Sequence, residues 1–322
     1  MTRVAERCGV AALLWLLLAG AAPADDAMGW LARMDQALRE LDYEGRFVYV
    51  HGHDVESLHL VHTVRDGQER ERLTSLNDAA REVVRDEDAT TCIMPDTGTV
   101  SIGPRHPHRR GGLIGLQPQQ LGEAYEARVD GPGRVAGRAA VFVSLLPRDR
   151  YRYGYRLALD DATALPLRTE VLDEAGVPLV QTLFVDLRVG AEVRSVPNAS
   201  PAPVAAERGT PERAVPPLRP ARSPWAFADL PRGFRLAMAA QRALPGHGRE
   251  LHHLVFSDGV ASVSIYIGAP GDHDLEGEAA VGPVNAYGAR LGEFHATALG
   301  EVPPATLKAF VAGLRRQPEA AP

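Results

Sequence analysis

The sequence predicts an α+β protein in which an antiparallel β-sheet with a few covering helices precedes a smaller α+β domain. Three observations predict this fold class. Short runs rich in Val, Leu, Thr and aromatic residues alternate with tight-turn residues, which is typical of antiparallel meanders. Helical spacing of apolar residues is confined to a few segments. A segment rich in Pro, Ala and Arg divides the chain, whose 322 residues correspond to about two domains.

The chain begins with a predicted secretory signal over residues 1–24. Arg3 and Arg7 supply the positive start, residues 10–19 form an apolar core, and Ala22-Pro23-Ala24 provide the small residues that a signal peptidase recognises. The apolar core is shorter than the roughly 20 residues that span a bilayer, so cleavage is favoured over a membrane anchor. The mature protein is therefore expected in the periplasm.

The net charge and the cysteine content argue against two classes of protein, namely nucleic-acid-binding proteins and proteins with an internal disulfide. A formal net charge of -6 argues against sequence-independent nucleic-acid binding as the main task. Cys8 lies in the expected signal, so Cys92 cannot form an internal disulfide in the mature chain. We interpret Cys92 as a buried, unreactive thiol in a strand. A reactive or intermolecular thiol is the alternative.

The first domain is expected over residues 25–192. Apolar residues at three- and four-residue spacing, among them Trp30, Met34 and Leu38, predict an amphipathic helix over residues 26–41. A second helix is expected over residues 117–128. Runs between turn residues predict strands at residues 46–51, 57–64, 71–76, 81–85, 90–94, 99–102, 139–146, 151–159, 167–172 and 179–187.

Residues 193–222 are expected to form a linker, because a segment rich in Pro, Ala and Arg with hardly any large apolar residue cannot form a core. Trp225 and Phe227 then begin the core of a second domain over residues 223–322. Its predicted elements are a hairpin of residues 252–256 and 261–267, a strand pair within residues 285–299 and a closing helix over residues 304–315.

Familiar catalytic signatures are absent from the sequence. It contains no G-x-S-x-G, P-loop, H-E-x-x-H or C-x-x-C motif, so we expect neither an enzyme nor a cofactor. The pairs His51/His53 and His59/His62 could bind a transition metal, but no carboxylate or thiolate occurs at a matching spacing. Histidines on solvated strand faces are the favoured interpretation, and no metal site is expected.

The segment Arg150-Tyr151-Arg152-Tyr153-Gly154-Tyr155-Arg156 has the most informative binding pattern. In a strand, its tyrosines would share one face, and Arg150, Arg152 and Arg156 would share the other. The tyrosines then either pack on the core or form the aromatic wall of a ligand cavity. The basic segment over residues 105–110 either binds anionic groups or is a solvated loop.

Four segments, in order along the chain, resemble a known family. They are residues 41–49 (LDYEGRFVY), residues 69–73 with 81–85 (ERERL and REVVR), residues 149–157 (DRYRYGYRL) followed by Leu165-Pro166-Leu167, and residues 253–264 (HLVFSDGVASVS). The family is MucB/RseB, periplasmic regulators of the envelope-stress sigma factor. The resemblance covers nearly the whole expected mature chain, and it leaves open the roles of the Pro-rich linker and of the basic segment.

The resemblance implies that the first domain is a half-open antiparallel β-barrel like that of the lipoprotein carriers LolA and LolB, with an apolar cavity. It implies binding to the periplasmic segment of a membrane-spanning, RseA/MucA-like anti-sigma factor, which shields that segment from a site-1 protease of the DegS type. A lipid or lipopolysaccharide ligand would weaken this complex. The alternative function is a lipid or lipoprotein carrier of the LolA/LolB type.

Candidate binding residues complete these expectations. The cavity candidates are Phe47, Tyr49, Leu58, Leu60, Tyr151, Tyr153, Tyr155 and Phe184. The candidates for contact with the anti-sigma factor are Ser257, Asp258, Gly259 and Tyr266 in the second domain. The candidates for anionic groups are Arg105, Arg109 and Arg110. No catalytic residue or nucleic-acid partner is expected, and homo-oligomerisation stays open.

Overall fold

The computed structural model describes residues 26–77, 82–85, 90–94, 98–102, 118–193, 219–220, 223–243, 250–272 and 274–317. The expected secretory signal, the basic segment with Arg105, Arg109 and Arg110, and most of the expected linker lie outside the described residues. No helix within the described residues combines the length and the apolar character needed to cross a membrane.

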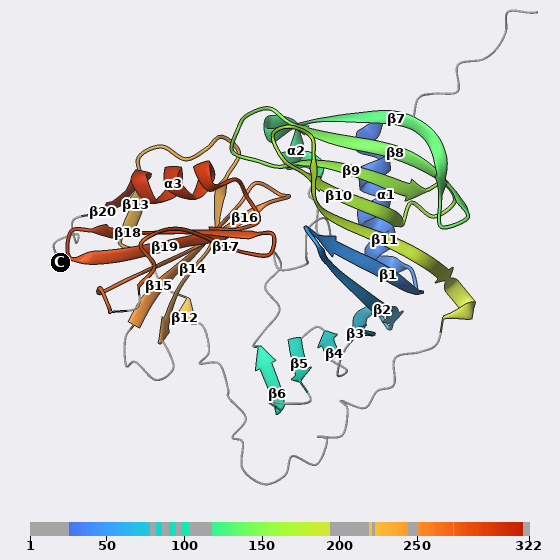
Figure 1. The fold of residues 1–322 in the computed structure, drawn as a ribbon, viewed down its shortest axis with the longest axis horizontal. Coiled ribbons are helices and arrows are strands. Elements are labelled where there is room, and N and C mark those ends of the chain that lie inside the picture. The colour runs from blue at the N-terminus through green and yellow to red at the C-terminus, as the bar shows by residue number, and fades with distance from the viewer. Residues whose placement is uncertain are drawn as a thin grey trace, which may run out of the picture.

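The first domain is built on an eleven-stranded antiparallel sheet in the order β6-β5-β4-β3-β2-β1-β11-β10-β9-β8-β7 (Figure 1). The first and last strands of this sheet, β1 and β11, pair near its middle. Among the described residues the edge strands β6 and β7 have one neighbour each, so the sheet is not closed. Its strands are β1 (Tyr43–His51), β2 (Asp54–Arg65), β3 (Gln68–Ser75), β4 (Glu82–Arg85), β5 (Thr90–Met94), β6 (Gly98–Ile102), β7 (Tyr125–Val135), β8 (Arg138–Pro147), β9 (Gly154–Asp160), β10 (Pro166–Leu172) and β11 (Pro178–Val189).

The helix α1 (Ala27–Glu40) covers one face of this sheet. The side chain of Asp26 caps its N-terminus by accepting hydrogen bonds from the backbone N–H groups of Met28 at 2.5 Å and Gly29 at 3.2 Å. Its apolar face is buried and packs in one core with strand residues such as Leu157. A short helix α2 (Pro118–Ala124) precedes β7, and a 3₁₀ turn η1 (Gly190–Glu192) follows β11.

The second domain has a seven-stranded sheet in the order β12-β14-β15-β16-β19-β18-β17 and a separate β13-β20 pair. The strands are β12 (Arg219–Pro220), β13 (Trp225–Phe227), β14 (Arg235–Ala243), β15 (Glu250–Ser257), β16 (Ser262–Gly268), β17 (Gly277–Val281), β18 (Val284–Leu291), β19 (Phe294–Gly300) and β20 (Leu314–Arg316). The helix α3 (Pro304–Gly313) packs against the sheet through Leu307 and Phe310. The predicted fold class is confirmed.

One predicted helix extends too far. The helix expected over residues 117–128 ends at Ala124, and Tyr125 begins β7, a strand that the sequence analysis did not predict. β7 contains Asp130-Gly131-Pro132-Gly133, a composition typical of a turn. The strand accommodates it with a register shift between Val129 and Gly131, where Gly131 adopts a φ of 125° that favours glycine.

The strand predicted over residues 151–159 begins only at Gly154. Asp149 accepts a hydrogen bond from the backbone N–H of Tyr151 at 2.9 Å, which forms a local turn that replaces the first residues of the strand. The strict alternation expected for Tyr151, Tyr153 and Tyr155 therefore does not occur. Arg152, expected on the face opposite the tyrosines together with Arg150 and Arg156, is buried.

Cys92 lies in β5 as predicted, opposite Val83 on β4 and Val100 on β6. In the second domain the predicted hairpin corresponds to β15 and β16, the strand pair to β18 and β19, and the closing helix to α3. The strands β14 and β17 were not predicted. In β14 the large apolar residues are Leu236 and Met238, and alanine and polar residues follow them, so its strand pattern is short and weak.

Candidate ligand cavity

A cavity of about 280 Å³ lies between α1 and one face of the first sheet. Most of its lining is apolar. Small-molecule pockets typically measure about 300–1,000 Å³, so this cavity suits one slender ligand. The lining residues are Leu38, Tyr43, Phe47, Tyr49, Leu60, Glu71, Leu73, Leu165, Pro166, Thr169, Val171, Val180, Thr182, Phe184, Leu187, Pro283 and Glu301.

The cross-strand register explains why these side chains converge. Phe47 on β1 lies opposite Phe184 on β11, and Tyr49 lies opposite Thr182. Residues opposite each other on neighbouring strands project from the same face of a sheet. The rings of Phe47 and Phe184 lie 5.5 Å apart between centroids, so they form one aromatic surface. Arg46, which precedes Phe47, is not part of the cavity lining and forms an exposed ion pair with Asp186 at 3.1 Å.

Gly45 allows the ring of Phe184 to lie across β1. A Cβ atom at position 45 would lie 2.9 Å from two ring carbons of Phe184 and would also collide with the carbonyl oxygen of Asp186. Real Cβ atoms do not approach other atoms this closely, so a larger residue would displace Phe184 or separate the strands. The glycine in the Glu44-Gly45-Arg46 segment thus shapes one wall of the cavity.

The second domain contributes two residues to the cavity. Pro283 lies in the turn between β17 and β18, and Glu301 follows β19. Figure 1 shows the strands of the second sheet directed toward the first domain. The cavity therefore has walls from both domains.

Glu301 is a partly buried carboxyl group in an apolar setting. Burial raises the pKa of Glu301 above its usual value, because the charged form loses contact with water. Among the described residues, no side chain forms a hydrogen bond or an ion pair with it. The nearby Tyr49 has a raised pKa for related reasons, first burial and then the charges of Glu301 and Glu56. Thr169 and Thr182, opposite each other on β10 and β11, and Glu71 are the other polar lining residues.

A buried ion pair joins the two domains. The side chains of Arg152 and Asp258 are both 0% exposed, and the Nε of Arg152 donates a hydrogen bond to Oδ2 of Asp258 at 2.6 Å. The terminal nitrogens of Arg152 donate to Asp149 and to the carbonyl oxygen of Arg232. The guanidinium carbon lies 4.8 Å from the centre of the Phe234 ring. Both charges therefore have several partners, as a buried ion pair requires.

Asn285 forms a second interdomain contact, beside the cavity. Its Nδ2 donates hydrogen bonds to the hydroxyl of Tyr153 and to the carbonyl oxygen of Val302, both at 2.9 Å. Thr306 adds a hydrogen bond from its hydroxyl to the carbonyl oxygen of Tyr151 at 2.8 Å. Because Val302 follows Glu301, the segment that reaches the cavity also takes part in the contact between the domains.

The structure places the predicted cavity residues in two groups. Phe47, Tyr49, Leu60 and Phe184 line the cavity, whereas Leu58, Tyr151, Tyr153 and Tyr155 lie outside it. Tyr155 is buried in the main core against Tyr125, with ring centroids 6.2 Å apart. Tyr153 and Tyr151 take part in the interdomain contact instead, because the turn at residues 149–152 directs them toward the second domain.

The structure places the four candidates for partner contact in two settings within the second domain. Asp258 is fully buried against Arg152, and it also accepts hydrogen bonds from the backbone N–H groups of Val260 at 2.9 Å and Ala261 at 2.8 Å. The hydroxyl of Ser257 accepts a hydrogen bond from the N–H of Gly259 at 3.1 Å. This hairpin turn thus contacts the first domain through Asp258. Tyr266 lies apart from it and stacks on His253, with centroids 4.2 Å apart.

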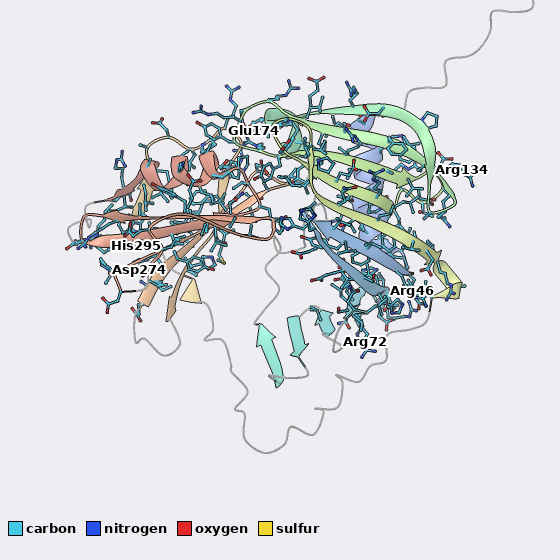
Figure 2. The ribbon with its side chains drawn as sticks, in the orientation of Figure 1. Arg46, Arg72, Arg134, Glu174, Asp274 and His295 are labelled. Carbon is cyan, nitrogen blue, oxygen red and sulfur yellow. The ribbon has the colours of Figure 1, made fainter. Side chains whose placement is uncertain are left out.

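A polar cluster in the second domain involves His295, Asp274 and Glu276. Figure 2 shows His295 and Asp274 close together, away from the first domain. Nε2 of His295 is 2.9 Å from the carbonyl oxygen of Leu275, and its Nδ1 is 3.8 Å from Asp274. The cluster joins the segment before β17 to β19. No set of metal-ligating side chains occurs within the described residues.

Sequence reasoning did not assign the interdomain roles of Arg152, Pro283 and Glu301. All three acquire their roles through the packing of one domain on the other, which leaves no local sequence pattern. Thr182 could have been found. It alternates with Val180 and Phe184 on β11, so two-residue periodicity places it on the same face as a residue already chosen.

Family models match nearly all of the chain beyond its first residues. Residues 26–204 match the MucB/RseB N-terminal domain, and residues 219–315 match the MucB/RseB C-terminal domain.

Individual relatives match over similar lengths. The chain is 33% identical over 317 residues to the sigma factor AlgU regulatory protein MucB of Pseudomonas aeruginosa, covering 95% of both chains. It is 26% identical over 305 residues to the sigma-E factor regulatory protein RseB of Escherichia coli, covering 94% of both. A solved MucA/MucB complex of Pseudomonas aeruginosa matches the structure with a TM-score of 0.70 and 29% identity, covering 91% of this chain and 99% of that chain.

Proposed function

The chain belongs to the MucB/RseB family, and from this we propose that it is a periplasmic negative regulator of an envelope-stress sigma factor. It binds the periplasmic segment of a membrane-spanning, MucA/RseA-like anti-sigma factor and shields that segment from site-1 proteolysis. The observation that carries the proposal is the match of both family domains, in order, across the chain. The similarity to a solved MucA/MucB complex supports the choice of partner.

A lipid-type ligand is the proposed signal. The cavity between α1 and the first sheet supports this, because its lining is largely apolar and includes the paired rings of Phe47 and Phe184. Burial of an alkyl chain contributes about 0.8 kcal/mol per methylene before the cost of ordering the chain. Even a short buried stretch therefore contributes substantially to affinity, and it shifts a conformational equilibrium to the extent that one state buries more of the chain than the other.

Coupling between the cavity and the partner is proposed to pass through the interdomain contact. A ligand can weaken partner binding only if it favours a state that binds the partner poorly. Pro283 and Glu301 line the cavity, and Val302 accepts the hydrogen bond from Asn285 that also reaches Tyr153. A ligand that moves Glu301 therefore acts on a segment that holds the domains together.

Binding measurements with the mature chain, residues 25–322, test the proposal. The purified periplasmic segment of the MucA-like protein from the same organism is immobilised, and an unrelated periplasmic segment serves as control. We expect specific binding, protection of the segment from a DegS-type protease, and loss of affinity when lipopolysaccharide is added. Absence of specific binding would refute the regulator. Transfer of a lipoprotein to acceptor vesicles without any partner binding would instead indicate a carrier.

A further inference from the structure

We infer that the cavity selects an alkyl or acyl chain whose polar end carries a hydrogen-bond donor or a positive charge, such as an ammonium, amide or hydroxyl group. Glu301 of the second domain binds that end, and the aromatic and aliphatic lining takes the chain. The inference rests on the proposed lipid-sensing function and deepens it, because it names the ligand class that the same cavity accepts.

The charged side chains of the cavity lining are acidic. Its charged side chains are Glu71 and Glu301, and the lining contains no Lys, Arg or His among the residues that the structure describes. A carboxylate at the end of the bound chain would meet like charges in a partly desolvated space, where repulsion is screened less than in water. An ammonium or N–H group would instead form a charge-assisted hydrogen bond, which is roughly twice as strong as a neutral one.

Glu301 is the carboxylate best placed to make that bond. Its side chain has no hydrogen-bond or ion-pair partner among the described residues, although burial disfavours its charged form. A ligand donor would supply the missing partner. Glu71, by contrast, already takes part in an interaction within the protein. The hydroxyls of Thr169 and Thr182 can accept further hydrogen bonds from the same ligand end.

The position of Glu301 has a further consequence for the ligand. Glu301 and Pro283 belong to the second domain, whereas Phe47, Leu60 and Phe184 belong to the first. A ligand whose chain contacts the first domain and whose polar end contacts Glu301 would join both domains. The polar end therefore determines how strongly the ligand favours one arrangement of the domains, and the chain alone contributes mainly affinity.

The test compares three ligands with the same alkyl chain and different ends. Dodecylammonium, dodecan-1-ol and dodecanoate compete with an environment-sensitive fluorescent probe for the mature chain at neutral pH. We expect dodecylammonium to bind about tenfold more tightly than dodecanoate, a difference of about 1.4 kcal/mol, with dodecan-1-ol between them. Equal or tighter binding of dodecanoate by the wild-type chain would overturn the inference.

The variant Glu301→Gln identifies the responsible residue. It should weaken dodecylammonium binding and strengthen dodecanoate binding, so that the ratio of the two affinities falls several-fold. Glu250→Gln removes the same charge from an exposed position in the same domain and should leave the ratio unchanged. An unchanged ratio in folded Glu301→Gln would also overturn the inference. If that variant does not fold, the order of the three ligand affinities in the wild-type chain still tests the inference.

These outcomes are separate from those of the proposed function. Ligand ranking is measured without any anti-sigma segment, so a preference for ammonium can hold even if the chain binds no such partner. Conversely, partner binding with a preference for dodecanoate would leave the regulator intact and reject only the ligand class.

Discussion

Arg152 of the first domain and Asp258 of the second form an ion pair at 2.6 Å in which neither side chain is exposed to solvent. Burying two charges is unfavourable unless each keeps its hydrogen-bond partners, and here Asp149, Arg232 and the turn after Asp258 supply them. The pair therefore depends on both domains keeping their present arrangement. Any movement of one domain relative to the other must either break this ion pair or move both of its residues together.

Arg152→Met is expected to destabilise the protein by about 3–5 kcal/mol, because it leaves the charge of Asp258 buried without its main partner. Chemical denaturation followed by circular dichroism measures the loss. Arg235→Met provides the matched control, since Arg235 and Glu123 form an exposed interdomain pair at 3.4 Å that contributes about 0–1 kcal/mol. Equal losses in the two variants would contradict the argument.

Asn285→Ala is expected to reduce the communication between cavity and partner. The substitution removes the interdomain hydrogen bond to Tyr153, and it also removes the hydrogen bond that holds Asn285 to Val302 next to Glu301. Partner affinity is measured with and without lipopolysaccharide, and the ratio should move toward one in the variant. The isolated stability change should be about 1–2 kcal/mol. A variant with an unaltered ratio would show that coupling takes another route.

Glu301→Gln is expected to stabilise the protein at neutral pH but not in acid. Burial raises the pKa of Glu301, so the folded state holds the proton more tightly than the unfolded state. The stability contributed by the neutral carboxyl is fully present below its unfolded pKa of about 4.3 and is lost as pH rises through the raised folded pKa. Thermal unfolding across this range should show the advantage of the variant growing with pH. An advantage that is constant with pH would argue against a raised pKa.

Gly45→Ala is expected to destabilise the first domain by about 1–3 kcal/mol and to alter the binding of alkyl ligands, because the added Cβ collides with Phe184 and Asp186. Gly29→Ala is the control. Apart from its chain neighbours and the backbone of its own helix, no described atom lies within 4 Å of a Cβ at that position, so alanine should be neutral or stabilising. Unfolding curves measure the stability of both variants, and the fluorescent-probe assay measures their binding of alkyl ligands. Similar behaviour of the two alanines would disprove the role of close packing.

Much of the fold could be predicted from the sequence, because local patterns dominate it. The helix α1 and the strands β2 and β3 follow apolar spacing and turn residues that need no tertiary information. The strand β7 escaped prediction because Gly131-Pro132-Gly133 is typical of a turn, and only pairing with β8 makes it extended. At such positions, pairing with a neighbouring strand determines the backbone conformation more strongly than the local composition does.

The cavity was less predictable than the fold. Phe47, Tyr49, Leu60 and Phe184 could be proposed because alternation along a strand places them on one face. The tyrosines of the 151–155 segment show the limit of that reasoning, since a single hydrogen bond from the N–H of Tyr151 to Asp149 turns the chain away from a strand. Glu301 could not be inferred from any local pattern, because its place at the cavity depends on how two distant segments pack.

The pairing of β1 with β11 has a consequence for assembly. The first sheet is two meanders, β1–β6 and β7–β11, that meet along one seam, and β6 and β7 are its outer strands in the described part of the chain. Severing the chain between β6 and β7 would leave every strand pairing of the described residues intact. Two separately expressed halves, one ending after β6 and the other beginning at α2, should therefore reassociate along that seam.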